Sequence, residues 1–246
     1  MLIKCLFLVL GSSLLTANFA NGQLSVGAAA GVSDNFLNSN IANQPYTLNR
    51  PKVGYSLGAK IENWLPGKFG LEADPEIIQK NHSMERTDSF YGIVENYRNT
   101  YLQVPVGVNW RFGKKKVFGF VGLGGYLGYW LAGRIKGRVP DILNANDSIY
   151  PNGQGSESIR LVSYDEKYVF DPKRDNRLEI GWFIGAGVNY RYRRKWIIFT
   201  ETRYYQSLSD QQKSYMINQV PRYNQTYSLI AGCKFLLGHY GLKSHN

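Results

Sequence analysis

The sequence YLQVPVGVNWRF at residues 101–112 alternates large apolar side chains with Gln, Pro, Gly, Asn and Arg. The apolar positions are Leu102, Val104, Val106, Val108, Trp110 and Phe112. Successive side chains of a β-strand point to opposite faces, so alternation over this length predicts a strand with one apolar face. Similar segments of about ten residues recur along the chain, and this repetition predicts an all-β protein.

We expect eight strands whose connections are alternately very short and long. The strands are expected at residues 24–32, 52–64, 68–80, 99–112, 117–133, 177–192, 195–206 and 225–238. Short connections such as Leu65-Pro66-Gly67 consist of turn residues, whereas 33–51, 81–98, 134–176 and 207–224 are long and polar. This order is typical of an antiparallel up-and-down barrel with every hairpin turn at one rim.

The two faces of the expected strands differ in polarity, and the charged face is expected to point into the barrel. We call the inward charges the lumen charge network: Lys60, Glu62, Glu72, Asp74, Glu76, Arg111, Glu179, Arg191, Glu201, Arg203 and Lys234. A soluble barrel would have its apolar face inside, so this polarity indicates a transmembrane barrel. Prolines 75 and 105 lie within expected strands and predict β-bulges there.

Aromatic residues support the same orientation, because Trp and Tyr gather where lipid meets water. At the rim with short turns we expect Trp110, Phe112, Tyr190, Tyr192, Trp196 and Phe235. Near the opposite rim we expect Tyr55, Tyr101, Tyr129, Tyr204 and Tyr227. Two aromatic girdles therefore accompany the predicted strand directions.

The first residues resemble a processing segment rather than part of the fold. Lys4 precedes an apolar stretch, and Ala20-Asn21-Gly22 offers a cleavage site, so residues 1–22 are expected to be a cleaved signal peptide. Residues 23–238 then form the barrel and 239–246 a short tail. These features predict an integral protein of the outer membrane of a Gram-negative bacterium, with both termini in the periplasm.

The formal net charge is +11, and its excess lies at the short turns. The expected periplasmic basic rim consists of Lys114, Lys115, Lys116, Arg193, Arg194 and Lys195. No nucleic-acid-binding motif accompanies these residues, so a nucleic-acid partner is not expected. Two partners fit the rim: anionic lipid headgroups or a periplasmic protein.

Neither catalysis nor cofactor binding is indicated. Glu72, Asp74 and Glu76 could form a carboxylate site, yet they also fit the polar-inward pattern of a barrel. His82 and Ser83 fall in a long loop, and no His, Cys, Asp or Glu spacing matches a metal site. We therefore expect no enzyme activity, no cofactor, no metal and no small-molecule substrate.

Several short motifs resemble one known family. Residues 101–106 (YLQVPV), 72–76 (EADPE), 122–128 (GLGGYLG) and 181–189 (GWFIGAGVN) are similar, in order and spacing, to strands of the PorT-like outer-membrane β-barrels of Bacteroidetes. The resemblance implies a small eight-stranded barrel. Its name-giving members are accessory factors of type IX protein secretion, and it implies no catalytic or ligand residues here.

Three roles remain open: a structural or interaction scaffold, an accessory component of type IX protein secretion, and a small-solute channel. Eight strands leave an interior that side chains fill, which favours a non-conducting structural or interaction scaffold over a small-solute channel. Partners would then be outer-membrane lipid and other outer-membrane or periplasmic secretion components. The largest expected interaction surface is the connection 134–176, with Tyr150, Tyr164, Tyr168 and Phe170.

Overall fold

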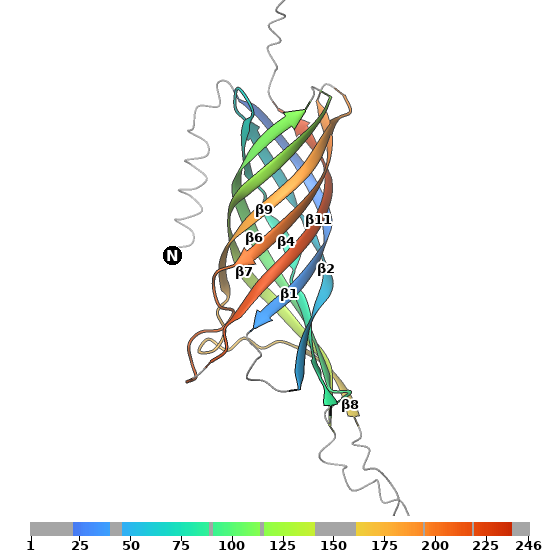
Figure 1. Cartoon of the computed structure of the whole chain (residues 1–246), viewed down its shortest axis with the longest axis vertical. Coiled ribbons are helices and arrows are strands. Elements are labelled where there is room, and N and C mark those ends of the chain that lie inside the picture. The colour runs from blue at the N-terminus through green and yellow to red at the C-terminus, as the bar shows by residue number, and fades with distance from the viewer. Residues whose placement is uncertain are drawn as a thin grey trace, which may run out of the picture.

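The computed structural model describes residues 22–39, 46–88, 91–113, 116–140, 161–193, 195–217 and 219–237. They form one antiparallel sheet that closes into a barrel (Figure 1). The strands are β1 Gln23–Ser39, β2 Thr47–Trp64, β3 Phe69–Ala73, β4 Glu76–Gln79, β5 Asn81–Arg86, β6 Val94–Gly113, β7 Val117–Pro140, β8 Leu161–Lys167, β9 Leu178–Arg191, β10 Trp196–Ser207 and β11 Arg222–Leu236.

The barrel is an eight-stranded ring, as the alternation predicts. β1 closes it by pairing with both β2 and β11, so that Ala30 lies opposite Leu57 on one side and Ala231 on the other. The segments β3, β4 and β5 succeed one another between β2 and β6, where they together occupy the place of the third strand. β8 is not part of the ring and pairs with the outer end of β7.

The predicted bulges at Pro75 and Pro105 are wrong. The pairing of β2 with β3 and β4 keeps one register across Pro75. Each proline lacks an N–H but retains a carbonyl that accepts a ladder bond: Ala59 N donates to Pro75 O at 2.9 Å, and Asp74 N donates to Pro105 O at 3.0 Å. The register shifts elsewhere, by one residue between β4 and β5 and between Thr100 and Tyr101.

Side chains alternate between the lipid-facing surface and the lumen. Leu57 is 60% exposed on the outside, whereas Lys60 is 2% exposed inside. Inside, aromatic rings lie directly on glycines of neighbouring strands: Phe183 on Gly124, and Phe120 on Gly187. A ring can approach the backbone this closely only where no Cβ intervenes, so glycines and aromatics together fill the narrow interior.

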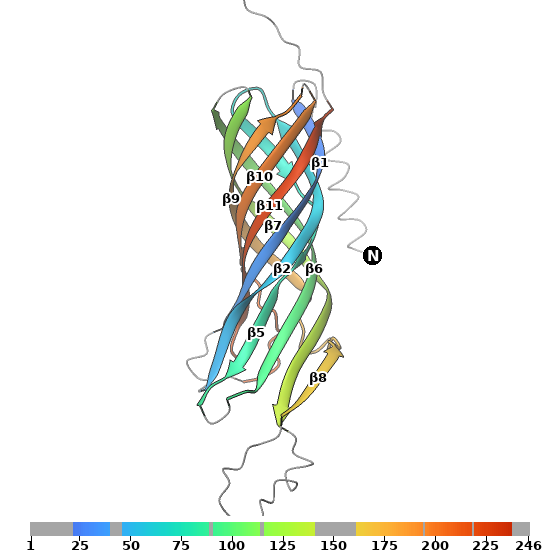
Figure 2. The same cartoon turned by 90° about the vertical axis from the view of Figure 1, so that its right-hand side faces the viewer.

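At the end opposite the hairpin turns, part of the wall continues well beyond the ring (Figure 2). We call this part the extramembrane sheet; it comprises residues 47–52 of β2, β5, 94–99 of β6, 132–140 of β7, and β8. The expectation that 33–51, 81–98 and 134–176 are loops is therefore partly wrong. Strand pairing continues there although the apolar alternation stops, because these strands no longer face lipid.

The predicted signal peptide and C-terminal tail lie almost entirely outside the described residues. Within the described ranges, the structure contains no helix long and apolar enough to cross a membrane.

Neighbouring glycines of β7 offer a matched test of the packing. A Cβ on Gly124 would lie 2.2 Å from Val106 O and 2.7 Å from the Phe183 ring, whereas a Cβ on Gly125 would meet nothing closer than Gly181 O at 3.6 Å. We expect Gly124→Ala to lower the free energy of unfolding by about 1–3 kcal/mol, as overpacking does. Gly125→Ala should change it by less than about 0.5 kcal/mol. Urea unfolding in lipid vesicles measures both, and equal effects would contradict the proposed packing.

Candidate functional site in the barrel lumen

The centre of the lumen holds five charged side chains in mutual contact. This central cluster consists of Lys60 from β2, Glu72 from β3, Asp74 from the β3–β4 junction, and Glu201 and Arg203 from β10. The Lys60 amino group lies 2.9 Å from Glu72, 2.9 Å from Asp74 and 2.8 Å from Glu201. Arg203 donates to Glu72 at 3.0 Å and also contacts Asp74 and Glu201. The two cations thus bridge opposite walls of the barrel.

A second pair lies toward the hairpin turns. Lys234 of β11 donates to Glu62 at 2.6 Å, and the indole of Trp64 donates to the same carboxylate at 3.1 Å. On the other side of the central cluster, Glu76 accepts from the Tyr205 hydroxyl at 2.8 Å and from Gln103 at 3.2 Å. The carboxylates of the lumen therefore have partners on strands far apart in the sequence.

Sequence reasoning missed one cation of the lumen. Lys80 is fully buried and contacts Glu179, which also accepts from Tyr126 at 2.8 Å and from Asn224 at 2.6 Å. The signal was available, because Lys80 continues the two-residue spacing of Glu72, Asp74 and Glu76. Its place next to a connection, at the last position of the expected strand, concealed it.

Two predicted members of the lumen charge network lie near strand ends beside the hairpin turns. Arg111 has the inward parity, but it lies at the rim, where its guanidinium donates to Gly67 O at 2.6 Å and lies 5.3 Å from the centre of the Trp64 ring. Arg191 is half-buried at the end of β9 beside the hairpin turn, where its backbone N–H donates to Lys116 O. A side chain that points inward this close to the end of a strand lies at the rim of the barrel and not in the lumen.

Side chains fill most of the space around the central cluster. The cavity beside the central cluster has a volume of about 10 Å³, about enough for one water molecule. Aromatic rings cover the cations on both sides: Lys60 lies 5.6 Å from the centres of Phe120 and Phe199, and Arg203 lies 5.0 Å from Phe183. The centre of the lumen is therefore a packed core that contains ion pairs.

Aromatic side chains also pack together at the mouth of the barrel opposite the hairpin turns. Trp130 stacks on Tyr101 at 5.9 Å and on Tyr168 at 5.1 Å, and Phe170 meets it edge-on at 4.9 Å. The expected placement of Tyr101 in the aromatic girdle opposite the short turns is wrong, since Tyr101 is 1% exposed and faces the lumen. Tyr168 and Phe170, both half-buried, pack against this aromatic cluster.

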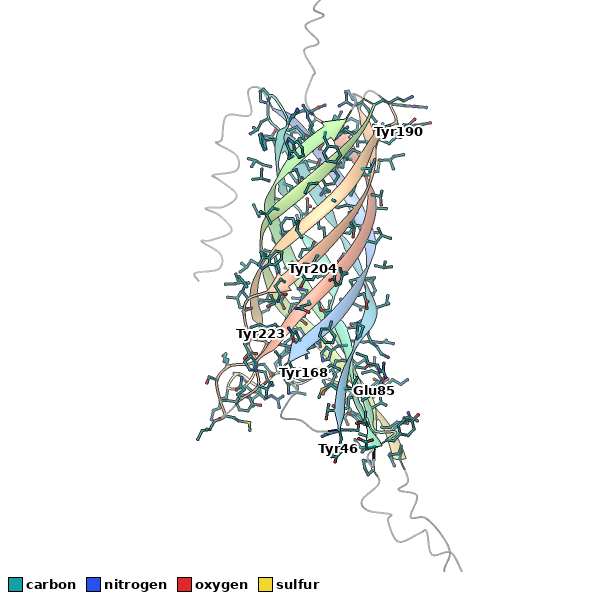
Figure 3. The ribbon with its side chains drawn as sticks, viewed as in Figure 1. Tyr46, Glu85, Tyr168, Tyr190, Tyr204 and Tyr223 are labelled. Atoms are coloured by element: carbon teal, nitrogen blue, oxygen red, sulfur yellow. The ribbon has the colours of Figure 1, made fainter. Side chains whose placement is uncertain are left out.

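The described part of the basic rim lies among aromatics at the opposite end. Figure 3 shows Tyr190 at this end, and Tyr46 and Glu85 beyond the other. Lys116 lies 5.8 Å from the Tyr190 ring, and Lys195 lies 5.6 Å from Phe235. Arg193 lies 5.4 Å from Tyr192, while Lys114, Lys115 and Arg194 are outside the described residues. Cations over rings suit a lipid–water boundary.

The structure buries His82 within β5, whereas the sequence places it in a loop. The His82 ring is 3% exposed and stacks on Tyr97 at 4.7 Å. Its burial, with a smaller effect of nearby Arg222, lowers the pKa of His82 to about 3. Among the described residues, no three His, Cys, Asp or Glu side chains are arranged to hold a metal ion.

Comparison with known proteins agrees with this architecture. The sequence pattern of the family described as the outer membrane protein beta-barrel domain matches residues 17–212. The chain belongs to this family. It is therefore an integral β-barrel protein of the outer membrane, surrounded by lipid. A search of curated proteins found no match.

Solved structures with a similar fold include three outer-membrane proteins. OprG from Pseudomonas aeruginosa is 10% identical, with 89% of this chain and 97% of that chain covered and a TM-score of 0.49. Neisserial surface protein A is 13% identical, with 86% of this chain and 96% of that chain covered and a TM-score of 0.40. The outer membrane protease OmpT from Escherichia coli is 10% identical, with 88% and 96% covered and a TM-score of 0.44.

Removing one cation tests the central cluster. Lys60→Met leaves Glu72, Asp74 and Glu201 with one cation fewer in a buried site, and we expect the free energy of unfolding to fall by about 3–5 kcal/mol. Lys68→Met, at an exposed position in the first hairpin turn, is the control and should have little effect. Urea unfolding in lipid vesicles compares the two, and equal stabilities would argue against the cluster.

His82 predicts a specific pH dependence. Its pKa is lower in the folded protein than in the unfolded chain, so the unfolded state binds the extra proton below about pH 6.5 and stability falls as the pH drops toward 3. Between pH 6.5 and 4.5 the contribution is about 2 kcal/mol. His82→Phe keeps a ring against Tyr97 and removes the titration. The mutant should lose less thermal stability than the wild type over this range, and parallel losses would contradict the assignment.

Proposed function

We propose that this protein is a non-conducting, non-enzymatic barrel that serves as a structural or interaction scaffold in the outer membrane. The observation that carries the proposal is the filled lumen. A channel of this length would need a continuous water-filled path, whereas the centre of the barrel holds ion pairs and rings around a cavity of about 10 Å³. A small-solute channel, the alternative left open by the sequence, would require this core to rearrange.

The orientation follows from the unequal ends of the barrel. Outer-membrane barrels place short turns in the periplasm and their longer connections outside the cell. On this basis we assign the hairpin turns to the periplasm, together with the start of β1 and the end of β11, which are the N- and C-terminal ends of the barrel domain. The extramembrane sheet then projects from the cell surface. Its hydrogen-bonded strands make it a rigid platform for contacts outside the membrane.

A narrower role, as an accessory part of type IX protein secretion, is favoured by the resemblance of residues 101–106 and 122–128 to PorT-like strands. The cations Lys116, Arg193 and Lys195 gather at one rim, which would suit a periplasmic partner of opposite charge. Crosslinking in native membranes, followed by identification of the bound proteins, tests this role. Recovery of secretion components would support it, and their absence would leave only the general scaffold.

The absence of enzyme activity is also part of the proposal. His82 is buried against Tyr97, and Glu72 and Asp74 are held by Lys60 and Arg203, so none of these groups is presented to a substrate. If His82→Phe abolished a deletion-complementing function while the barrel still assembled, this part of the proposal would fail.

Planar-bilayer recording distinguishes scaffold from channel. We expect purified wild-type protein to give no steady single-channel current, because side chains block the lumen. As a control for the assay, the double variant Phe183→Ala with Arg203→Ala removes two large side chains from the centre and should give measurable conductance if it inserts. Steady currents from the wild-type protein would overturn the non-conducting assignment.

A further inference from the structure

The outward face of the extramembrane sheet is strongly basic. Its cations are all exposed: Arg50, Lys52, Arg98, Arg134, Lys136, Arg138 and Lys167. Among the described residues of the sheet, the acidic side chains on this face are Glu85, paired with Arg50, and Asp165, paired with Arg134. The connection 134–176 is neutral in composition, but Arg134, Lys136 and Arg138 lie at two-residue spacing on one face of β7, and pairing brings Arg98 and Lys167 beside them.

Three of these cations stand side by side in the sheet register. Arg98 of β6 lies directly opposite Arg134 of β7, and Arg134 lies directly opposite Lys167 of β8. Like charges in directly opposed positions destabilise a sheet. Asp165 neutralises part of this charge. The hydrogen bond from Arg134 and the positive charges of Arg134, Lys136 and Arg98 lower the pKa of Asp165. A surplus of positive charge remains that a bound anion would neutralise.

The basic face continues the lipid-facing surface of the barrel. Arg98 lies on the same face of β6 as Leu102, which is exposed to lipid four residues away. On β7, Arg134 follows the exposed Tyr129 and Leu131. The cations thus begin where the apolar band ends, at the depth where headgroups surround a barrel.

We propose that this face binds the phosphate groups of lipid headgroups in the outer leaflet of the membrane. The site is formed by Arg98, Arg134 and Lys167, flanked by Lys136 on the same face. Guanidinium groups bind phosphate oxygens through paired N–H donors, and Lys adds a point charge. The assignment to the outer leaflet rests on the orientation proposed above, whereas phosphate binding does not depend on it.

The test compares full-length variants in neutral detergent micelles by native mass spectrometry and by titration. The probes are diphosphoryl lipid A, its dephosphorylated form, and phosphatidylcholine. The variant Arg98→Gln, Arg134→Gln, Lys167→Gln, called the row variant, removes the three cations that lie side by side. The control Arg86→Gln, Lys173→Gln, Lys213→Gln removes the same charge from exposed positions outside both this face and the basic rim. We expect the row variant to bind diphosphoryl lipid A with about tenfold or more weaker affinity than wild type, and the control variant to bind it as wild type does.

Two further readouts separate this role from a structural one. Without phospholipid, the row variant should melt at or above the wild-type temperature, because it loses like-charge repulsion. Inorganic phosphate at the lipid concentration should not displace lipid A. Equal binding of the dephosphorylated lipid, undiminished binding by the row variant, displacement by free phosphate, or capture of a polyanion such as heparin in preference to lipid A would each overturn the proposal.

The leaflet is tested separately. In a Cys233→Ser background, Ser163→Cys on β8 should react with an impermeant maleimide on intact cells, and Lys68→Cys should react only after the outer membrane is opened. The reverse pattern would refute the orientation while leaving the micelle result valid. A failure in micelles with normal labelling would refute the lipid site and leave the scaffold proposal standing.

Discussion

The structure depends on one constraint: hydrocarbon surrounds the barrel, so every charged side chain of the spanning strands must be neutralised inside it. Lys60 and Arg203 meet this need by binding Glu72, Asp74 and Glu201 from across the lumen. Removing one partner of such a group leaves an uncompensated buried charge, which costs far more than the intact group gains. The charges therefore fix which strands face one another across the interior.

The same constraint explains the glycines and aromatics of the lumen. An eight-stranded ring is narrow, and ion pairs alone would leave gaps between the walls. Phe120 and Phe183 fill these gaps by lying on Gly187 and Gly124 of adjacent strands. Their rings also lie beside Lys60 and Arg203, which replaces lost hydration of the cations with contact to aromatic faces. The same side chains thus neutralise the buried charges and fill the space between the walls.

Sequence reasoning succeeded where alternation has a single physical cause and failed where two causes meet. Within the lipid band, period two identified the strands and placed Lys60, Glu72 and Glu201 inside. At strand ends the side chains still alternate between the two faces, but an inward position there faces the rim of the barrel. Arg111 therefore lies at the rim and not in the lumen. Beyond the band the apolar residues stop while hydrogen bonding continues, so β5 and β8 escaped prediction. Apolar alternation indicates which side chains contact lipid, so it identifies a strand only where that strand lies in the lipid band.

The sequence by itself determined the eight-stranded barrel, the polarity of its two faces and most members of the lumen charge network, because these follow from which residues tolerate hydrocarbon. Only the tertiary structure decided which charges meet, that Lys80 joins Glu179, and that Trp130, Tyr168 and Phe170 pack together at the mouth. It also brought Arg98 and Lys167 beside Arg134 on one sheet face. The reason is register: residues distant in the chain become neighbours only through strand pairing, and composition holds no information about that pairing.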